Sequence, residues 1–300
     1  MTALESEVWF RSDDARIYGT LCRPESTDRS PAAILVHGFG SFRDELTGFA
    51  ELAQHLAGAG IASLRIDMRG CGQSGIRGLM HPIWDWVADL RQAISFLETS
   101  PSVIPDRIGV VGMSMGGGVA CTAAAIDTRL RVVVALAPVA DGEGWFKHLW
   151  STSRGEEGWR MFQEKIAADR RSRANGHRPV SLPVLDAMAY SPQDRSAFLE
   201  MSEKYPAFLR RIRLSAVDSA LRVRTVPLAP LIAPRPLLII HSRTDTSVPV
   251  QQAEALYGAA RDPRHLALLD DSPHCFWIGN QSRRVQQETV DWLKKYLFQQ

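Results

Sequence analysis

The chain of 300 residues is 45% hydrophobic and 23% charged, with a formal net charge of +2 at pH 7. This balance is typical of a soluble globular protein with one large domain, and it gives no drive toward nucleic acid, a membrane surface or an acidic partner. The N-terminal residues hold no apolar segment of signal-peptide length, and no run approaches the roughly 18 to 20 apolar residues of a membrane span. We therefore expect a cytoplasmic protein.

Cysteine usage argues in the same direction. The four cysteines are scattered without close pairing: Cys22, Cys71, Cys121 and Cys275. Their spacing fits neither a zinc site nor a disulfide framework. We expect reduced thiols, no metal and no cofactor. The sequence leaves open whether the chain is a monomer or a homodimer.

The first forty residues predict a β-hairpin followed by a buried strand. Residues 5–11 and 16–23 alternate apolar and polar side chains, as strands with one solvated face do, and Asp13-Asp14 between them suits a turn. The run 32–37 is continuously apolar, which is typical of a strand covered on both faces in a parallel sheet.

The rest of the chain alternates between predicted helices and strands. Apolar side chains at helical spacing predict helices over 46–59, 83–98, 115–126, 250–260 and 285–298. Short apolar runs predict strands over 61–67, 108–113, 132–137, 237–241 and 266–269. This alternation implies an α/β fold, with a mostly parallel sheet covered by helices on both faces.

The alternation stops between the strands at 132–137 and 237–241. Helix-forming residues occupy 159–170 and 196–223 in this interval, with a break near Pro206. We therefore interpret 141–234 as a helical lid inserted into a core made of 1–140 and 235–300.

A serine stands between a predicted strand and a predicted helix, in the stretch VVGMSMGGGVA. Ser114 has Gly112 two residues before it and Gly116 two residues after it, matching G-x-S-x-G. So tight a turn strains the serine backbone, tolerates only small neighbours, and lifts Oγ clear of the sheet. A phosphate-binding loop is disfavoured, because Gly112 lacks a glycine two residues on and no lysine follows the glycines.

A serine nucleophile needs a base, which is usually a histidine oriented by a carboxylate. Of the eight histidines, His274 lies between the last predicted strand and the last predicted helix, where parallel sheets present catalytic groups. His241 lies inside an apolar strand and is interpreted as a core residue. For the carboxylate, Asp245 follows the strand at 237–241, and Asp141 remains a competitor.

The tetrahedral intermediate of acyl transfer needs two N–H donors fixed in advance. Met115, directly after the serine, supplies one of them. The loop Gly38-Phe39-Gly40 should supply the other through the N–H of Phe39, which makes His37 a structural residue rather than a base.

With these residues in place, the chain resembles the α/β-hydrolase superfamily. Within it, the chain looks like the serine esterases and acyl-peptidase-like hydrolases related to cinnamoyl (feruloyl) esterases. The matching stretches are VHGFG at 36–40, RIDMRGCGQSG at 65–75, GMSMGG at 112–117, HSRTDTSVP at 241–249 and SPHCF at 272–276.

The resemblance implies an eight-stranded sheet whose second strand is antiparallel. It carries over Ser114, Asp245 and His274 as the catalytic triad, in the chain order of this superfamily. It also carries over Phe39 and Met115 as the oxyanion hole, and a helical lid after the sixth strand.

The favoured reading is a serine hydrolase that cleaves a carboxylic ester through an acyl-enzyme. A thioesterase or acyltransferase using the same triad is the alternative, and a non-catalytic protein that keeps the fold is a third reading. The partner is then a small-molecule ester or thioester. Trp145 and Trp150, near the start of the insertion, are the best candidates for substrate contacts.

Overall fold

The computed structural model describes residues 3–26, 28–74, 82–190 and 192–299. Gly75, the last residue of the matching stretch at 65–75, lies outside the described residues.

The described residues form one eight-stranded sheet in the order β1-β2-β4-β3-β5-β6-β9-β10. Strand β2 runs antiparallel to both β1 and β4, and the other neighbouring pairs are parallel. The predicted fold class and the antiparallel second strand are thus confirmed. The strands are β1 (Ala3–Ser12), β2 (Ala15–Pro24), β3 (Ser30–Val36), β4 (Ala62–Ile66), β5 (Val103–Met113), β6 (Leu130–Leu136), β9 (Leu237–Ser242) and β10 (Arg264–Leu269).

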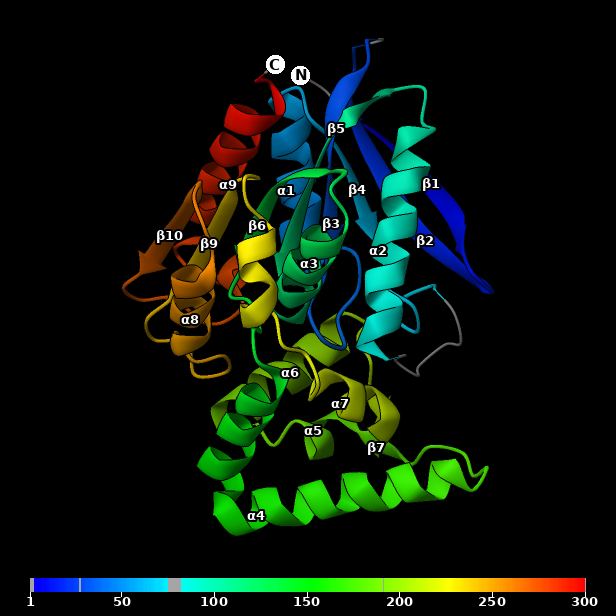
Figure 1. Cartoon of the computed structure of the whole chain (residues 1–300), viewed down its shortest axis with the longest axis vertical. Helices are drawn as coiled ribbons and strands as arrows, with labels where there is room; N and C mark the ends of the chain where they lie inside the picture. Colours follow the sequence, from blue (N-terminus) through cyan, green and yellow to red (C-terminus); the bar gives the residue numbers. More distant parts are fainter. Residues whose placement is uncertain (1–2, 27, 75–81, 191, 300) are drawn as a thin grey trace.

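Helices cover both faces of this sheet (Figure 1). Side chains alternate between the faces along each strand, so Leu35 of β3 packs in one apolar cluster and Ile34 in the other. The cluster with Leu35 contains α1 (Gly48–Gly58) and α9 (Ser282–Leu297). The cluster with Ile34 contains α2 (Ile83–Glu98), α3 (Met115–Ile126) and α8 (Gln251–Ala259).

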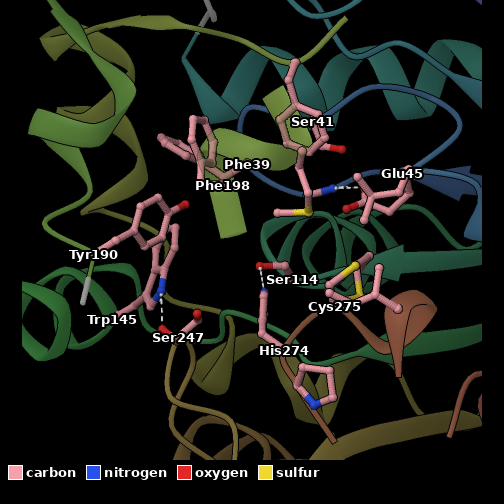
Figure 2. Close-up of a pocket in the computed structure, with 17 residues that line it drawn as sticks. Phe39, Ser41, Glu45, Ser114, Trp145, Tyr190, Phe198, Ser247, His274 and Cys275 are labelled. Atoms are coloured by element: carbon pink, nitrogen blue, oxygen red, sulfur yellow. Dashed lines mark hydrogen bonds between the residues drawn. The ribbon is translucent and has the colours of Figure 1, made fainter. Parts of the chain in front are cut away.

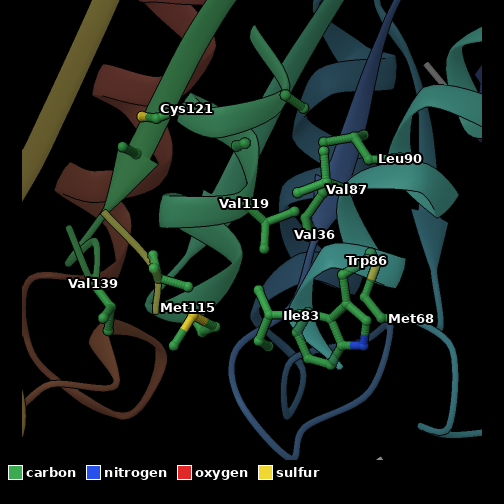
Figure 3. Close-up of a cluster of buried hydrophobic side chains, with 14 of the residues drawn as sticks. Val36, Met68, Ile83, Trp86, Val87, Leu90, Met115, Val119, Cys121 and Val139 are labelled. Atoms are coloured by element: carbon green, nitrogen blue, oxygen red, sulfur yellow. The ribbon is translucent and has the colours of Figure 1, made fainter. Parts of the chain in front are cut away.

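The core between α2 and α3 supports the loops that follow β3 and β4 (Figure 3). Trp86 of α2 is fully buried, and its Nε1–H donates to the carbonyl oxygen of Arg69 at 3.2 Å. The Arg69 guanidinium also pairs with the buried carboxylate of Asp89, one turn further along α2, at 2.9 Å. The loop after β4 is thereby held against α2, close to the end of β3.

Most of the interval between β6 and β9 lies beyond one end of the sheet, away from both termini, whereas residues 226–231 pack beside the sheet against α3 and α8 (Figure 1). The elements of this interval are α4 (Gly142–Ala174), β7 (Ser181–Pro183), α5 (Val184–Ala187), α6 (Pro192–Lys204), β8 (Arg211–Arg213), α7 (Leu214–Ala220) and the 3₁₀ helix η1 (Val226–Leu231). We call residues 141–234 the inserted segment.

Two expectations for the inserted segment need correction. The helix predicted over 159–170 begins already at Gly142, and it is kinked at Gly155, whose φ of 70° is not helical. The helical residues predicted over 196–223 are broken near Pro206 as expected, since α6 ends at Lys204, but the interval before α7 also contains the strand β8, which pairs antiparallel with β7. Three-residue strands carry too little periodicity to be predicted from sequence.

Two glycines permit the tight turn between β5 and α3. A Cβ on Gly112 would lie 2.1 Å from the carbonyl oxygen of Gly116, and a Cβ on Gly116 would lie 2.2 Å from that of Val36. Both obstacles are backbone atoms, which cannot rotate away. The turn therefore fits directly against the end of β3 only when both positions lack a side chain.

Replacing Gly116 by alanine should consequently destabilise the fold by at least ~2 kcal/mol, because the new methyl group overlaps backbone. Gly58 is the matched control, since it ends α1 in open space and alanine there should stabilise by about 0.5 kcal/mol. Urea unfolding of Gly116→Ala and Gly58→Ala measures both. A Gly116→Ala protein as stable as the parent would contradict this account of the turn.

Candidate active site

Ser114 lies at the turn from β5 into α3, with a backbone conformation that non-glycine residues rarely adopt. Its φ is 55° and its ψ is −119°. The N–H of Ser114 donates to Leu136 O at 2.7 Å, and its carbonyl oxygen accepts from Gly117 N–H at 2.9 Å. These bonds fix the strained residue to β6 on one side and α3 on the other, so its side chain has a defined direction.

The structure brings His274 and Asp245 to Ser114 from two separate loops. Asp245 follows β9 and His274 follows β10. His274 Nδ1–H donates to Asp245 Oδ2 at 2.6 Å, and Nε2 lies 3.0 Å from Ser114 Oγ (Figure 2). The three residues that sequence reasoning selected thus form one continuous hydrogen-bonded chain.

The Asp245 carboxylate is prepared to hold the imidazole. Burial raises the pKa of Asp245, but His274, His241 and the backbone N–H of Val248 outweigh burial and leave this pKa below its usual value. Oδ1 accepts from the N–H groups of Ser247 and Val248, both at 2.9 Å. An ionised carboxylate only accepts, so Nδ1 of His274 carries the proton and Nε2 accepts from the serine hydroxyl.

The loop after β3 approaches the nucleophile closely. The Cβ of Ser114 lies only 3.4 Å from the point that a Cβ on Gly38 would take. Phe39 follows Gly38 in this loop, and Met115 begins α3, where N–H groups lack partners within the helix. The geometry puts both residues beside the serine.

His37 holds this loop as a neutral residue. Its Nδ1–H donates to Gly38 O at 2.8 Å, and Nε2 accepts from the N–H of Met68 at 3.0 Å. Burial lowers the pKa of His37 to about 4, so the ring is uncharged at neutral pH. Its two nitrogens are both used, which agrees with a structural role.

The other competing residues have structural contacts. Asp141 begins α4, where its side chain accepts from the N–H of Glu143 at 3.2 Å, and it pairs with Arg224. His241 is fully buried in β9, and its Nε2 donates to the carbonyl oxygen of Val248 at 2.9 Å.

A largely apolar cavity of about 160 Å³ opens at Ser114 and His274. The inserted segment contributes five of its lining side chains: Trp145, Tyr190, Phe198, Met201 and Phe208. The indole N–H of Trp145 donates to Ser247 O at 2.9 Å, and its ring meets the ring of Phe39 edge to face (Figure 2).

Trp150, the other tryptophan expected near substrate, packs elsewhere. Its indole ring stacks on Phe162 with 4.0 Å between ring centres, and its N–H donates to Ala187 O. These contacts lie within the inserted segment, and Trp150 is not part of the cavity wall that the described residues form.

Sequence reasoning missed three polar residues of the cavity wall: Ser247, whose carbonyl oxygen accepts from Trp145, and the pair Ser41 and Glu45. Ser41 and Glu45 lie in the loop after β3. Glu45 Oε2 accepts from the N–H of Gly38 at 2.7 Å. The only signal in the sequence is the short distance of these residues from the glycines at 38 and 40, which does not indicate where their side chains point.

The described residues contain neither a membrane-spanning helix nor a cluster of metal-binding side chains. No helix in these ranges is both long enough and apolar enough to cross a membrane. Within the same residues, no group of three or more His, Cys, Asp or Glu side chains is placed to hold a metal ion.

Known proteins include relatives whose sequence similarity extends over almost the whole chain. A polyketide transferase, grgF of a Penicillium species, is 25% identical over 280 residues, covering 91% of this chain and 90% of its own. A thiohydrolase, aneE of Aspergillus aculeatus, is 24% identical and covers 97% of this chain and 93% of its own. Transferase and hydrolase activities thus both occur among similar sequences.

Solved structures show the same fold. The α/β hydrolase GrgF from Penicillium superposes with a TM-score of 0.81 at 24% identity, covering 98% of this chain and 99% of its own. Est1E from Butyrivibrio proteoclasticus with bound ferulic acid gives a TM-score of 0.72 at 18% identity, and the match covers 97% of this chain and 100% of Est1E. The family model described as serine aminopeptidase, S33 (Hydrolase_4), matches residues 28–279. The chain therefore belongs to this family of α/β hydrolases.

Proposed function

We propose that the protein is a serine hydrolase that cleaves a carboxylic ester through an acyl-enzyme. The observation that carries this proposal is the hydrogen-bonded chain from Asp245 through His274 to Ser114, at the mouth of an apolar cavity. Such a chain activates a hydroxyl that is otherwise a weak nucleophile.

In the first half of the reaction, Ser114 Oγ attacks the carbonyl carbon while His274 Nε2 takes the hydroxyl proton. The N–H groups of Phe39 and Met115 stabilise the oxyanion that forms. The imidazolium, held by Asp245, then gives its proton to the leaving group, and the acyl group stays on Ser114. In the second half, water repeats these steps with the acyl-enzyme and releases the acid.

A thioesterase or acyltransferase is the second candidate, and the relatives favour it specifically. Proteins named as a thiohydrolase and as polyketide transferases are similar to this chain over at least nine tenths of its length. The acyl-enzyme is common to all three reactions. They differ in the leaving group and in whether water or another nucleophile receives the acyl group, so thioesters and alcohol acceptors should be assayed beside simple esters.

Ser114→Ala should lose about 10⁴-fold or more in kcat, because it removes the hydroxyl that lies within hydrogen-bonding distance of His274 Nε2, the base that activates it. The rate of p-nitrophenyl acetate hydrolysis measures this loss. A fluorophosphonate probe should label the parent protein at Ser114 alone, as read by peptide mass. Covalent labelling at another residue would refute the assignment.

Asp245→Asn should lower kcat by up to about 10⁴-fold while the protein stays folded, because an amide favours the wrong histidine tautomer. Asp141→Asn is the matched control in the loop after the neighbouring strand β6, and it should change kcat less than about 2-fold because the Asp141 side chain contacts Glu143 N–H and Arg224. The reverse order of effects would assign the acid to the loop after β6.

Trp145→Ala should raise KM for a p-nitrophenyl hexanoate about 10-fold and for the acetate no more than about 2-fold, because only the longer chain reaches the lost apolar wall. Trp150→Ala removes the same indole on the same helix away from the cavity. That control should affect both esters equally. Equal effects on the two esters in a folded Trp145→Ala protein would show that this wall does not contact the acyl chain.

A further inference from the structure

The cavity wall carries a carboxyl group that the proposed acyl transfer does not use. Glu45 is only 7% exposed and lines the cavity on the side of Ser114 opposite Trp145 and Tyr190 (Figure 2). Glu45 Oε1 and Ser114 Cβ each lie 3.4 Å from the point that a Cβ on Gly38 would take. The carboxyl and the nucleophile thus flank the same glycine.

The backbone is strained at the residue that places this carboxyl. Glu45 has a φ of 42° and the next residue, Leu46, a φ of 68°. Both values lie in the left-handed region, which residues with side chains seldom adopt. Hydrogen bonds from Glu45 N–H to Phe42 O and from Gly48 N–H to Glu45 O hold the turn. Strain of this kind, beside a nucleophile, points to a use for the side chain.

The charge state of Glu45 differs from that of an ordinary glutamate. Burial raises its pKa to about 7, and within the described residues no lysine or arginine pairs with it. Of the titratable groups that interact with it, His274 faces it across the site. The other two are the thiols of Cys71 and Cys275, which burial keeps protonated.

Below pH 7 the Glu45 side chain is therefore a neutral acid. The oxygen that accepts from Gly38 N–H is then its carbonyl oxygen, so Oε1 carries the proton and can donate it into the cavity. Above pH 7 the group becomes a carboxylate, which only accepts.

A second polar group lies beside this carboxyl. The hydroxyl of Ser41 is buried and lines the same cavity. It is near enough to Glu45 to lower the pKa of that carboxyl, yet its Oγ makes no hydrogen bond of normal geometry with any described group. Buried polar atoms without a protein partner are uncommon, and in a cavity wall they are suited to meet a ligand.

We propose that Glu45 and Ser41 form a polar subsite that binds an oxygen atom on the acyl chain. The inference rests on the proposed acyl-transfer function. Because the carboxyl flanks the nucleophile, the oxygen belongs close to the reacting carbonyl, on the second or third carbon. A hydrocarbon chain would offer no partner to the Ser41 hydroxyl or to Glu45 Oε1, the carboxyl oxygen that Gly38 N–H does not occupy. The enzyme should therefore select hydroxy- and oxo-acyl groups over hydrocarbon acyl groups of the same length.

Thioesters that share the N-acetylcysteamine leaving group test this selection directly. The panel contains butanoyl, 3-hydroxybutanoyl, 3-oxobutanoyl and 3-methylbutanoyl groups, the last matching the hydroxy compound in shape. At pH 6, kcat/KM for the 3-hydroxy and 3-oxo thioesters should exceed that for the 3-methyl thioester by about 10-fold, because only they pair the buried polar groups. Equal values would overturn the proposal.

Variants assign the selection to Glu45. Glu45→Gln still accepts from Gly38 N–H through its amide oxygen and donates through its NH₂ group, so it should keep the preference within about 3-fold. The methionine in Glu45→Met has a similar length but cannot donate a hydrogen bond. In this variant the ratio of kcat/KM for the 3-hydroxy or 3-oxo thioester to that for the 3-methyl thioester should fall to about 1. Asp44→Asn, on the same loop but paired with Arg65 and outside the cavity, is the control and should match the parent protein. An unchanged preference in Glu45→Met would overturn the proposal.

A ratio of two substrates isolates the proton on Glu45. Between pH 5.5 and pH 8 the parent protein should lose about 10-fold in preference for the 3-oxo over the 3-hydroxy thioester, because a carboxylate accepts from a hydroxyl but cannot donate to a ketone. The titration of His274 affects both substrates alike and cancels. The ratio should stay flat in Glu45→Gln. A flat ratio in the parent protein would contradict the role given to this proton.

Failure of this proposal is distinguishable from failure of the proposed function. A protein that cleaves none of the four thioesters and no simple ester, and that a fluorophosphonate leaves unlabelled, has no acyl-transfer chemistry. A protein that cleaves butanoyl and 3-methylbutanoyl thioesters as fast as the oxygenated ones keeps that chemistry and lacks the polar subsite.

Discussion

The close approach of the β5–α3 turn to the end of β3 is the constraint on which the rest of the site depends. Gly116 lies against the backbone of Val36 and His37, so α3 begins directly beside the loop that follows β3. An N–H group at the start of α3 and one in the loop after β3 can point at the same atom only when these two backbone segments lie in contact. The left-handed backbone of Ser114 costs on the order of 1–3 kcal/mol, which the buried packing of α3 between β5 and β6 offsets.

The loop after β9 joins the acid to the cavity wall. Ser247 donates its N–H to Asp245 and accepts through its carbonyl oxygen from the indole of Trp145. The inserted segment is thereby tied to the loop that orients His274. Its aromatic side chains line the cavity at Ser114. Asp245 is itself buried, and the low dielectric of a buried site strengthens the interaction between this carboxylate and the imidazole. The backbone of Ser247 therefore positions both the Asp245 carboxylate and the Trp145 side chain of the cavity wall.

Sequence periodicity predicts the sheet and its helices well because long buried runs carry a strong signal. It also predicts the loops that present Ser114, Asp245 and His274, since parallel strands end at one edge. The inserted segment is harder. Trp145 and Trp150 lie five positions apart on α4, so they project about 140° apart, and no local rule says which one faces the core. The place of Glu45 depends on left-handed backbone at two ordinary residues, which no sequence pattern predicts.

Asp245 and Glu45 are two buried carboxyls at one site with opposite pKa shifts. Asp245 receives two backbone N–H groups and an imidazole, whereas Glu45 receives one backbone N–H. Since the pKa of Glu45 is raised from 4.5 to about 7 by burial, the stability it contributes is present below pH 4.5 and is lost as the pH rises through 7, a loss of about 3 kcal/mol at 1.36 kcal/mol per unit. Glutamine would hold Gly38 equally well without this loss. This loss fits the proposal above that Glu45, rather than an amide, lies here because its proton is donated to an oxygen atom in the cavity.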